Sequence, residues 1–342
     1  MIPTAAELIA MRSAIDFAMH PEAAIGPNPR VGCILISNDG TYVAQGFHRG
    51  RGYPHAEIAA INNAETSLAG ATAVVTLEPC LRLDRESSCA TALVEAGITR
   101  IVIGQSDLTA QAAGGIELLK QKGVDVVTNV LSDECSSINP WFTVSMAQKL
   151  PYVRLKLVTS LDGRIAAQDG SSKWISSAPA RDYVHNLRSQ SSALISSVRS
   201  ALVDQSQLSA RNSDGSKMPN QPLVVLVGSS EISEKHPVFQ TGNTVELFPD
   251  RDLRKLLVDL YQRQHLSVLV EAGPTLATAL LKQQLVNELI WITAPIIMGD
   301  TGLPAIGDLG IDTISSAWRP HLHGRDQMGL DFVNILQFTT EL

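Results

Sequence analysis

The sequence predicts an α/β protein of two domains, and three observations support this. A chain of 342 residues suggests two domains, each large enough for a core of its own. Apolar runs of strand length alternate with segments of helical periodicity in both halves, which favours mostly parallel sheets with helices on both faces. A hydrophobic content of 44% with 18% charged residues is typical of an ordinary globular protein.

The first half is expected to form one α/β layer. Apolar runs predict buried strands, and the spacing of apolar residues predicts two helices that follow His55 and Cys89, the second stopped by Gly97. The expected strands are 31–36, 71–77, 101–104 and 123–127, and the expected helices are 56–64 and 89–96. A short helix-like stretch then leads to a break in the pattern.

This break, near residues 146–151, gives expected domains at 1–148 and 149–342. Strands of the second domain are predicted at 152–158, 222–228 and 267–270. Its longest loop is expected at 211–221, which is rich in Ser, Asn, Gly and Pro. A helix is predicted from Pro274, directly after a strand and a small-residue turn, and the free amides of such a helix start suit a phosphate. Without a complete Gly-x-Gly-x-x-Gly pattern, this is a weak dinucleotide signal by itself.

The most informative stretch of the first domain runs from residue 54 to residue 89. It contains His55, Cys80 and Cys89, and Glu57 follows His55 by two positions. Two cysteines and one histidine leave one corner of a tetrahedron open, as catalytic zinc requires, and the metal lowers the pKa of a water there to about 7. Glu57 cannot easily ligate the same ion, but it can reach this water and move protons. This division of labour is that of zinc nucleobase deaminases.

The predicted elements bring these residues together. His55 and Cys89 each precede or open a helix and Cys80 follows a strand, and helix dipoles stabilise thiolates at helix starts. The alternative is an isolated histidine with two ordinary cysteines. The interval between Cys80 and Cys89 is also wider than the usual Cys-x-x-Cys of deaminases.

Charge and cysteine content exclude several classes of protein. A net charge of −7 argues against bulk binding of nucleic acid or anionic membranes. No apolar stretch approaches a membrane span and no targeting segment is evident, which indicates a cytoplasmic protein. Four cysteines are too sparse for a disulfide framework. Cys33 is expected in the core because it lies in the apolar run 31–36, and Cys135 is expected to be a plain thiol. Taken singly, Arg181, Arg188 and Arg211 are each typical of a solvated surface charge.

An ordered set of motifs extends over nearly the whole chain. In the first half these are residues 26–33, 46–48, 54–57 and 76–80, and in the second half 155–156, 160–163, 170–176, 270–276 and 294–299. Together they resemble the bifunctional riboflavin-biosynthesis family, in which a pyrimidine deaminase is fused to an NADPH-dependent reductase. The wide spacing of the two cysteines is the one that this family uses.

The resemblance implies a cytidine-deaminase-like α/β/α domain followed by a dihydrofolate-reductase-like α/β domain. It implies one Zn²⁺ per chain and NADPH as cofactors, and self-association into a homo-oligomer. The implied small-molecule substrate is a phosphoribosylated diaminopyrimidinone, which loses an exocyclic ring amine before hydride from NADPH converts its ribosyl group to a ribityl chain.

The resemblance also implies roles for individual residues. Glu57 is the implied proton carrier, His55, Cys80 and Cys89 are the zinc ligands, and Asn28 and His48 border the base and ribose. The reductase substrate is held by Ser172, Arg188, Leu208, Arg211 and Glu271, where arginines suit a phosphate. NADPH is contacted by Val158, Trp174, Ser200, Asp204, Gly273, Pro274 and Thr275.

Three segments depart from the family pattern: residues 81–88, 107–110 and 200–206. The first two shape the deaminase pocket, whereas Ser200 and Asp204 keep a hydroxyl and a carboxylate in the third. One alternative is therefore a divergent relative with only reductase activity or with altered deaminase specificity. Another is a non-catalytic protein with structural zinc, although that role requires neither Glu57 nor an open fourth position.

Overall fold

The protein consists of two compact units, residues 1–148 and 149–342. The computed structural model describes residues 2–20, 28–50, 52–81, 88–107, 109 and 114–338. Each unit has a sheet and apolar cores of its own.

The first unit is built on a five-stranded sheet with the order β2-β1-β3-β4-β5. Its strands are β1 (Gly32–Ile36), β2 (Tyr42–Phe47), β3 (Thr72–Leu77), β4 (Arg100–Gln105) and β5 (Asp125–Val127). Strand β1 lies between β2 and β3 and is antiparallel to both, whereas β3, β4 and β5 are parallel. Every residue of β1 and β3 is buried, which explains the continuous apolar runs at these positions.

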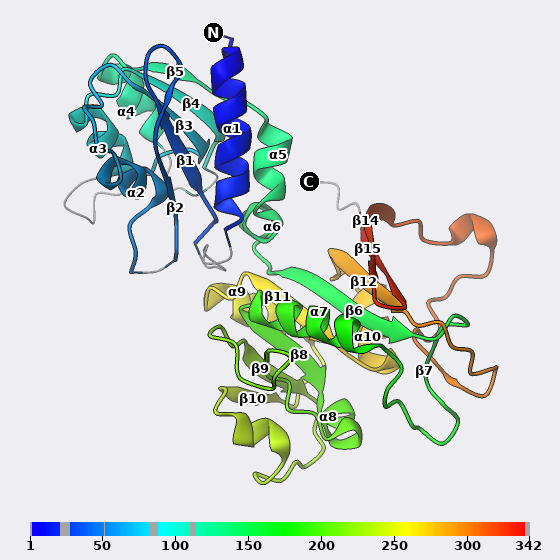
Figure 1. Ribbon diagram of the computed structural model, residues 1–342. Coiled ribbons are helices and arrows are strands. Elements are labelled where there is room, and N and C mark those ends of the chain that lie inside the picture. The colour runs from blue at the N-terminus through cyan, green and yellow to red at the C-terminus, as the bar shows by residue number, and fades with distance from the viewer. Residues whose placement is uncertain are drawn as a thin grey trace. The chain divides into compact units, whose positions relative to one another are not determined.

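Helices cover both faces of this sheet (Figure 1). They are α1 (Ala5–Ala18), α2 (Ala56–Asn62), α3 (Cys89–Glu95), α4 (Gly115–Gln121), α5 (Ser132–Ser137) and α6 (Pro140–Gln148). Cys33 and Leu35 point to the core beneath α2, α3 and α4, and Ile34 and Ile36 point to the core beneath α1. The unit is therefore the three-layer α/β/α domain that the resemblance implies.

The backbones of β2 and α2 come into direct contact at Gly46. A Cβ atom there would lie 2.2 Å from the Ala56 carbonyl oxygen and 2.3 Å from the Ala60 nitrogen. Only glycine permits so close an approach. Because α2 follows His55 and contains Glu57, this contact sets the position of both side chains relative to the sheet.

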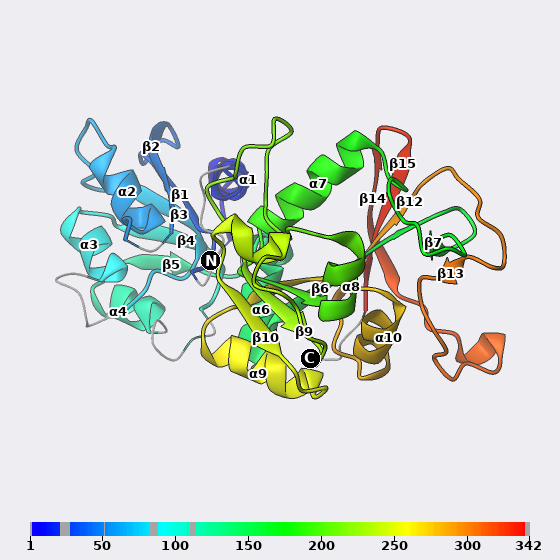
Figure 2. The same ribbon diagram turned by 90° about the horizontal axis from the view of Figure 1, so that it is seen from below.

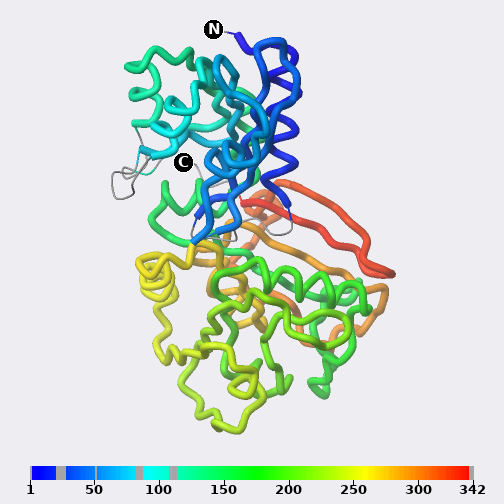
Figure 3. Tube along the Cα trace, turned by 60° about the vertical axis from the view of Figure 1, so that its left-hand side comes forward, coloured from blue at the N-terminus to red at the C-terminus, as the bar shows by residue number. Residues whose placement is uncertain are grey.

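The second unit is built on an eight-stranded sheet with the order β10-β9-β8-β11-β6-β12-β15-β14. Its strands are β6 (Tyr152–Thr159), β8 (Ala193–Ser197), β9 (Leu223–Val227), β10 (Val245–Phe248), β11 (Ser267–Glu271), β12 (Glu288–Thr293), β14 (His321–Met328) and β15 (Asp331–Gln337). The six strands from β10 to β12 in this order are parallel, as the sequence predicts. The antiparallel pair β14 and β15 completes one edge and forms the long red hairpin in Figure 3.

Two pairs of helices enclose the parallel part of this sheet. They are α7 (Ala178–Ser189) and α8 (Val198–Asp204) on one face, and α9 (Leu253–Gln262) and α10 (Pro274–Lys282) on the other. Figure 2 shows α7 on the opposite side of the sheet from α9 and α10. The remaining elements are a small two-stranded sheet of β7 (Arg164–Ala166) and β13 (Leu303–Pro304), and the 3-10 turns Pro237–Thr241 and Ile314–Ser316.

Both cysteines outside the metal motif are buried. Cys33 lies in the core beneath α2, as expected. The Cys135 thiol is 3.7 Å from the sulfur of Met11, so it packs against a neighbour within the core beneath α1. None of the helices in the described part of the chain combines the length and apolar character that a membrane span needs.

Candidate zinc and reductase sites

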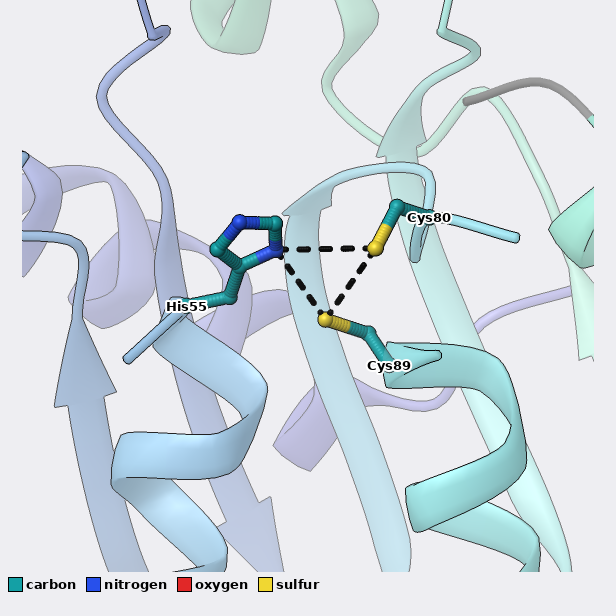
Figure 4. A group of neighbouring side chains, drawn as sticks. All are labelled: His55, Cys80 and Cys89. Carbon is teal, nitrogen blue, oxygen red and sulfur yellow. Dashed lines mark hydrogen bonds between the residues drawn. The ribbon is translucent and has the colours of Figure 1, made fainter. Parts of the chain in front are cut away.

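Three side chains from separate elements converge at one end of the first sheet (Figure 4). His55 is the N-cap residue of α2, Cys89 is the first residue of α3, and Cys80 follows the end of β3. The Nδ1 atom of His55 is 3.2 Å from Sγ of Cys89 and 3.5 Å from Sγ of Cys80, and the two sulfurs are 3.4 Å apart. The structure thus brings together all three predicted ligands.

This donor set fits a zinc ion. Bond lengths of about 2.0–2.1 Å to nitrogen and about 2.3 Å to sulfur place the ligand atoms of a tetrahedral zinc site roughly 3.6–3.8 Å apart. The separations of 3.2–3.5 Å between the three atoms are only slightly shorter, so small outward shifts accommodate the ion. Ring nitrogen and thiolate sulfur are also the ligands that Zn²⁺ prefers.

The surroundings of the three ligands favour proton transfer and a thiolate at Cys80, whereas the hydrogen bond with Cys80 and then burial raise the pKa of Cys89. Hydrogen bonding with Cys89, followed by that with His55, lowers the pKa of Cys80 to about 3. Glu57 is buried beside these ligands, and this burial raises the pKa of its carboxyl to about 7. A carboxyl group with such a pKa accepts and releases protons readily near neutrality.

Of the two predicted pyrimidine-binding residues, His48 lies next to the ligand His55, and Asn28 contacts His48. Nδ2 of Asn28 is 3.0 Å from Nε2 of His48, and Nδ1 of His48 is 3.0 Å from the carbonyl oxygen of Pro54. The rings of His48 and His55 meet edge to face with their centroids 5.0 Å apart. Two divergent segments, 81–88 and 107–110, are described only in part. Residues 82–87, 108 and 110 lie outside the described residues.

Glu78 has a role that the motif around it does not reveal. This buried carboxylate accepts hydrogen bonds from the backbone amides of Asp107 (3.1 Å), Gly114 (3.2 Å) and Ile116 (3.2 Å). It therefore ties the end of the strand that leads to Cys80 to the segment between β4 and α4. In the sequence, its position directly after an apolar strand is what indicates this role, because a carboxylate buried there needs hydrogen-bond donors.

A buried ion-pair cluster marks the second unit. Glu271, at the end of β11, accepts hydrogen bonds from Nε (2.5 Å) and Nη2 (3.0 Å) of Arg188 and from Nζ of Lys156 (3.0 Å). The side chains of Arg188 and Glu271 are only 12% and 10% exposed. The expectation that Arg188 is a solvated surface charge is therefore wrong, because a carboxylate on a neighbouring strand compensates for its burial.

A second basic group adjoins this cluster. Arg188 donates from Nη1 to the carbonyl oxygen of Ser209 (3.0 Å), next to the buried Leu208, and Nδ1 of His185 is 3.1 Å from the same oxygen. The backbone amide of Arg211 donates to His185 at 3.3 Å. Burial and then the charges of Arg188 and Arg211 lower the pKa of His185 to about 4.

The implied NADPH residues lie at four places in the second unit. A Cβ atom on Gly273 would be 3.4 Å from Oγ of Ser200, which brings the start of α10, with Pro274 and Thr275, next to the start of α8. The Ser172 hydroxyl donates to Asp204 at 3.1 Å. Trp174 is exposed and stacks with Arg181, whose guanidinium lies 4.5 Å from the ring centroid. Val158 lies on β6.

These positions fit a dinucleotide phosphate. β8 and β11 are parallel neighbours, so α8 and α10 begin side by side at the same edge of the sheet. Gly273 caps α10 without a side-chain hydrogen bond, which leaves the first amides of that helix available. Helix starts at the carboxyl ends of adjacent parallel strands are the usual place for phosphate groups in α/β proteins.

Family comparisons agree with this division into two sites. Residues 6–105 match the cytidine and deoxycytidylate deaminase zinc-binding region, and residues 151–338 match the RibD C-terminal domain. The fold and sites define a bifunctional enzyme in which a zinc-dependent deaminase is joined to an NADPH-dependent reductase.

Similar proteins narrow this class to one family. A riboflavin biosynthesis protein RibD from Haemophilus influenzae is 35% identical over 95% of each chain, and one from Escherichia coli is 36% identical over 84% of this chain and 88% of the relative. The chain belongs to this family, the riboflavin biosynthesis protein RibD.

Two solved structures superimpose on this chain over almost its full length. Acinetobacter baumannii RibD superimposes with a TM-score of 0.91 at 30% identity, over 98% of this chain and 99% of the other. A diaminohydroxyphosphoribosylaminopyrimidine deaminase/5-amino-6-(5-phosphoribosylamino)uracil reductase from Thermotoga maritima gives 0.87 at 28% identity, over 97% and 98%. The α/β architecture expected for both units is thereby confirmed.

Proposed function

We propose that the protein deaminates 2,5-diamino-6-(5-phosphoribosylamino)pyrimidin-4(3H)-one and then reduces the ribosyl group of the product to a ribityl chain with NADPH. Residues 1–148 carry the first reaction and residues 149–342 the second. The observation that carries the proposal is the convergence of His55, Cys80 and Cys89 beside the buried Glu57, in a chain that also has the reductase unit.

In the first reaction, His55, Cys80 and Cys89 would hold a Zn²⁺ ion, which would supply a nucleophile at neutral pH by acidifying a bound water molecule. Glu57 takes the proton of that water and passes it to the ring nitrogen, which makes the adjacent ring carbon electrophilic. A second proton delivered through Glu57 lets the exocyclic amine leave as ammonia. In the net reaction, water is consumed, and an oxo group replaces the amine on the ring. Asn28 and His48 hold the base and ribose while this happens.

In the second reaction, NADPH supplies hydride to C1 of the opened ribose. Its binding is assigned to Val158, Trp174, Ser200, Asp204, Gly273, Pro274 and Thr275. The substrate is assigned to Ser172, Arg188, Leu208, Arg211 and Glu271. The pKa of the Arg211 guanidinium is lowered by burial and by the charge of Arg188, so an anion between the two arginines relieves their repulsion. A phosphate has the charge and the acceptor geometry for this place.

A coupled assay tests both halves of the proposal. Purified protein with the aminated substrate alone is expected to release ammonia, and NADPH is expected to be oxidised only after deamination. Zinc content is measured on the same sample. If the chain uses NADPH on the deaminated substrate but leaves the aminated precursor untouched, it is a reductase only and the first half of the proposal is wrong.

The protein is further proposed to be a cytoplasmic homo-oligomer. All four cysteines are buried free thiols, which suits a reducing compartment. Self-association follows from the family resemblance, and light scattering after size exclusion measures it directly. A mass of one chain, 36.7 kDa, would contradict the oligomer.

A further inference from the structure

A buried asparagine between α5 and α6 holds a distant segment of backbone. Asn139 is 3% exposed, and its side chain makes two hydrogen bonds to Arg30, 109 positions earlier in the chain. Oδ1 accepts from the Arg30 amide at 2.8 Å, and Nδ2 donates to the Arg30 carbonyl oxygen at 2.7 Å. This reciprocal pair satisfies both backbone groups of one residue and fixes that residue in two directions.

The next two residues of the same segment are fixed as well. The carbonyl oxygen of Val31 accepts the amide of His48 at 3.1 Å, and the amide of Gly32 donates to Oγ1 of Thr76 at 3.2 Å. The guanidinium of Arg30 additionally lies over the Trp141 ring, 5.2 Å from its centroid. Residues 30–32 are therefore anchored to β3, to the residue after β2 and to the start of α6.

Asn28 stands only two residues before this anchored point. Its amide is held 3.0 Å from His48, whose ring packs against that of the zinc ligand His55. A shift of the Arg30 backbone therefore moves the Asn28 amide relative to the zinc ligands. Displacing a positioning group by about 1 Å costs on the order of 10²-fold in rate.

We propose that Asn139 is a positioning residue of the deaminase, which acts by holding the Arg30 backbone so that the Asn28 amide meets the substrate. The proposal rests on the proposed function, in which Asn28 contacts the pyrimidine. Asn139 itself touches neither the zinc ligands nor Glu57 in any contact of the described residues.

A double-mutant cycle tests this proposal. Asn139→Ala, Asn28→Ala and the double variant are compared for ammonia release, zinc content and NADPH-dependent reduction of the deaminated substrate. Asn139→Ala is expected to lower deaminase kcat/KM by about 10- to 100-fold with zinc content and reductase turnover unchanged. In the Asn28→Ala background, the same change is expected to cost less than about threefold, because its effect passes through Asn28.

Two further variants keep the outcome clear. Asn38→Ala, an exposed asparagine in the turn between β1 and β2, is the matched control and is expected to retain full activity. Asn139→Asp retains the acceptor for the Arg30 amide but loses the donor, and it replaces Asn139→Ala if that variant does not bind zinc. Asn139→Asp is expected to bind zinc fully and to lower deaminase kcat/KM less than Asn139→Ala does.

The results separate failure of this inference from failure of the proposed function. If the unaltered chain releases no ammonia, the proposed function is wrong. If Asn28→Ala impairs deamination while Asn139→Ala does not, or if the two losses add fully, only the inference is overturned. If Asn28→Ala has no effect, the inference falls together with the assigned role of Asn28.

Discussion

Replacing Glu271 with glutamine is expected to destabilise the second unit strongly. The change keeps the side-chain shape but removes the negative charge that faces Arg188 and Lys156 at 2.5–3.0 Å. The Arg188 and Lys156 side chains are only 12% and 14% exposed, so water cannot replace the lost partner. Leaving a buried charge without its partner costs about 3–5 kcal/mol, and we expect Glu271→Gln to lower the free energy of unfolding by that amount.

The pH dependence of this contribution has a definite sign. Burial alone would raise the pKa of Glu271, but the charges of Arg188 and Lys156 outweigh burial and lower the pKa well below its ordinary value of 4.5. A carboxylate with a depressed pKa stabilises the fold above its unfolded-state pKa and loses that effect as pH falls through the folded-state value. The difference between wild type and variant is therefore expected to be constant above pH 5 and to shrink in acid.

Urea unfolding monitored by tryptophan fluorescence measures the change in the free energy of unfolding of the second unit. Three of the four tryptophans, Trp174, Trp291 and Trp318, lie in the second unit. In a Trp141→Phe background, tryptophan fluorescence, excited selectively over tyrosine, thus reports on residues 149–342 alone. This separation matters because a two-unit chain need not unfold in one step.

An exposed ion pair in the same unit provides the control. Glu246 likewise accepts two hydrogen bonds from one arginine, from Nη1 (2.8 Å) and Nη2 (2.7 Å) of Arg263, but the Glu246 and Arg263 side chains are 39% and 38% exposed. Glu246→Gln is expected to cost less than about 1 kcal/mol. Adding Lys156→Met to Glu271→Gln should recover part of the loss. Equal losses for the two single variants would refute the reasoning from burial.

Three further outcomes are expected. Glu57→Gln should lower deaminase kcat by about 10²- to 10⁴-fold at unchanged zinc content and reductase turnover, and full activity would exclude Glu57 as the proton carrier. Cys80→Ser should lose zinc and ammonia release together while NADPH-dependent reduction persists, which metal analysis and the two assays measure. Between pH 6.5 and about 4, His185 is protonated in the unfolded chain but not in the folded one, so the free energy of unfolding falls as pH is lowered. His185→Asn should make the urea midpoint depend less on pH in this range, and an unchanged pH dependence would contradict the low pKa of His185.

Apolar runs predict every strand of the first sheet except β2, but only β6, β9 and β11 of the eight-stranded sheet. β1, β3 and β11 agree with the expected strands to within one residue, because each is almost wholly buried and mostly apolar. β6 is also found at the expected place, but there apolar residues alternate with Arg154 and Lys156. The hairpin of β14 and β15 is not predictable in this way. Most residues of β14 are exposed and polar, so neither alternation nor an apolar run marks the strand.

Some residues of the candidate sites are predictable from the sequence and others are not. His55, Glu57, Cys80 and Cys89 are recognisable because their chemistry is rare and their spacing follows the ends of predictable elements. Contacts between residues far apart in sequence have no local signature, as the Asn139 bonds across 109 positions and the burial of Arg188 against Glu271 across 83 positions illustrate. An arginine looks the same in sequence whether it faces water or a buried carboxylate.

The contact between Gly46 and α2 makes zinc affinity depend on a residue that offers no ligand. A methyl group on Gly46 would force α2 outward by roughly 1 Å, and His55 and Glu57 would move with the helix as one rigid piece. Cys80 and Cys89 belong to other elements and would stay behind, so the gap between imidazole and thiolates would widen. An alanine at position 46 is therefore expected to leave the reductase folded and to lower the zinc content of the deaminase.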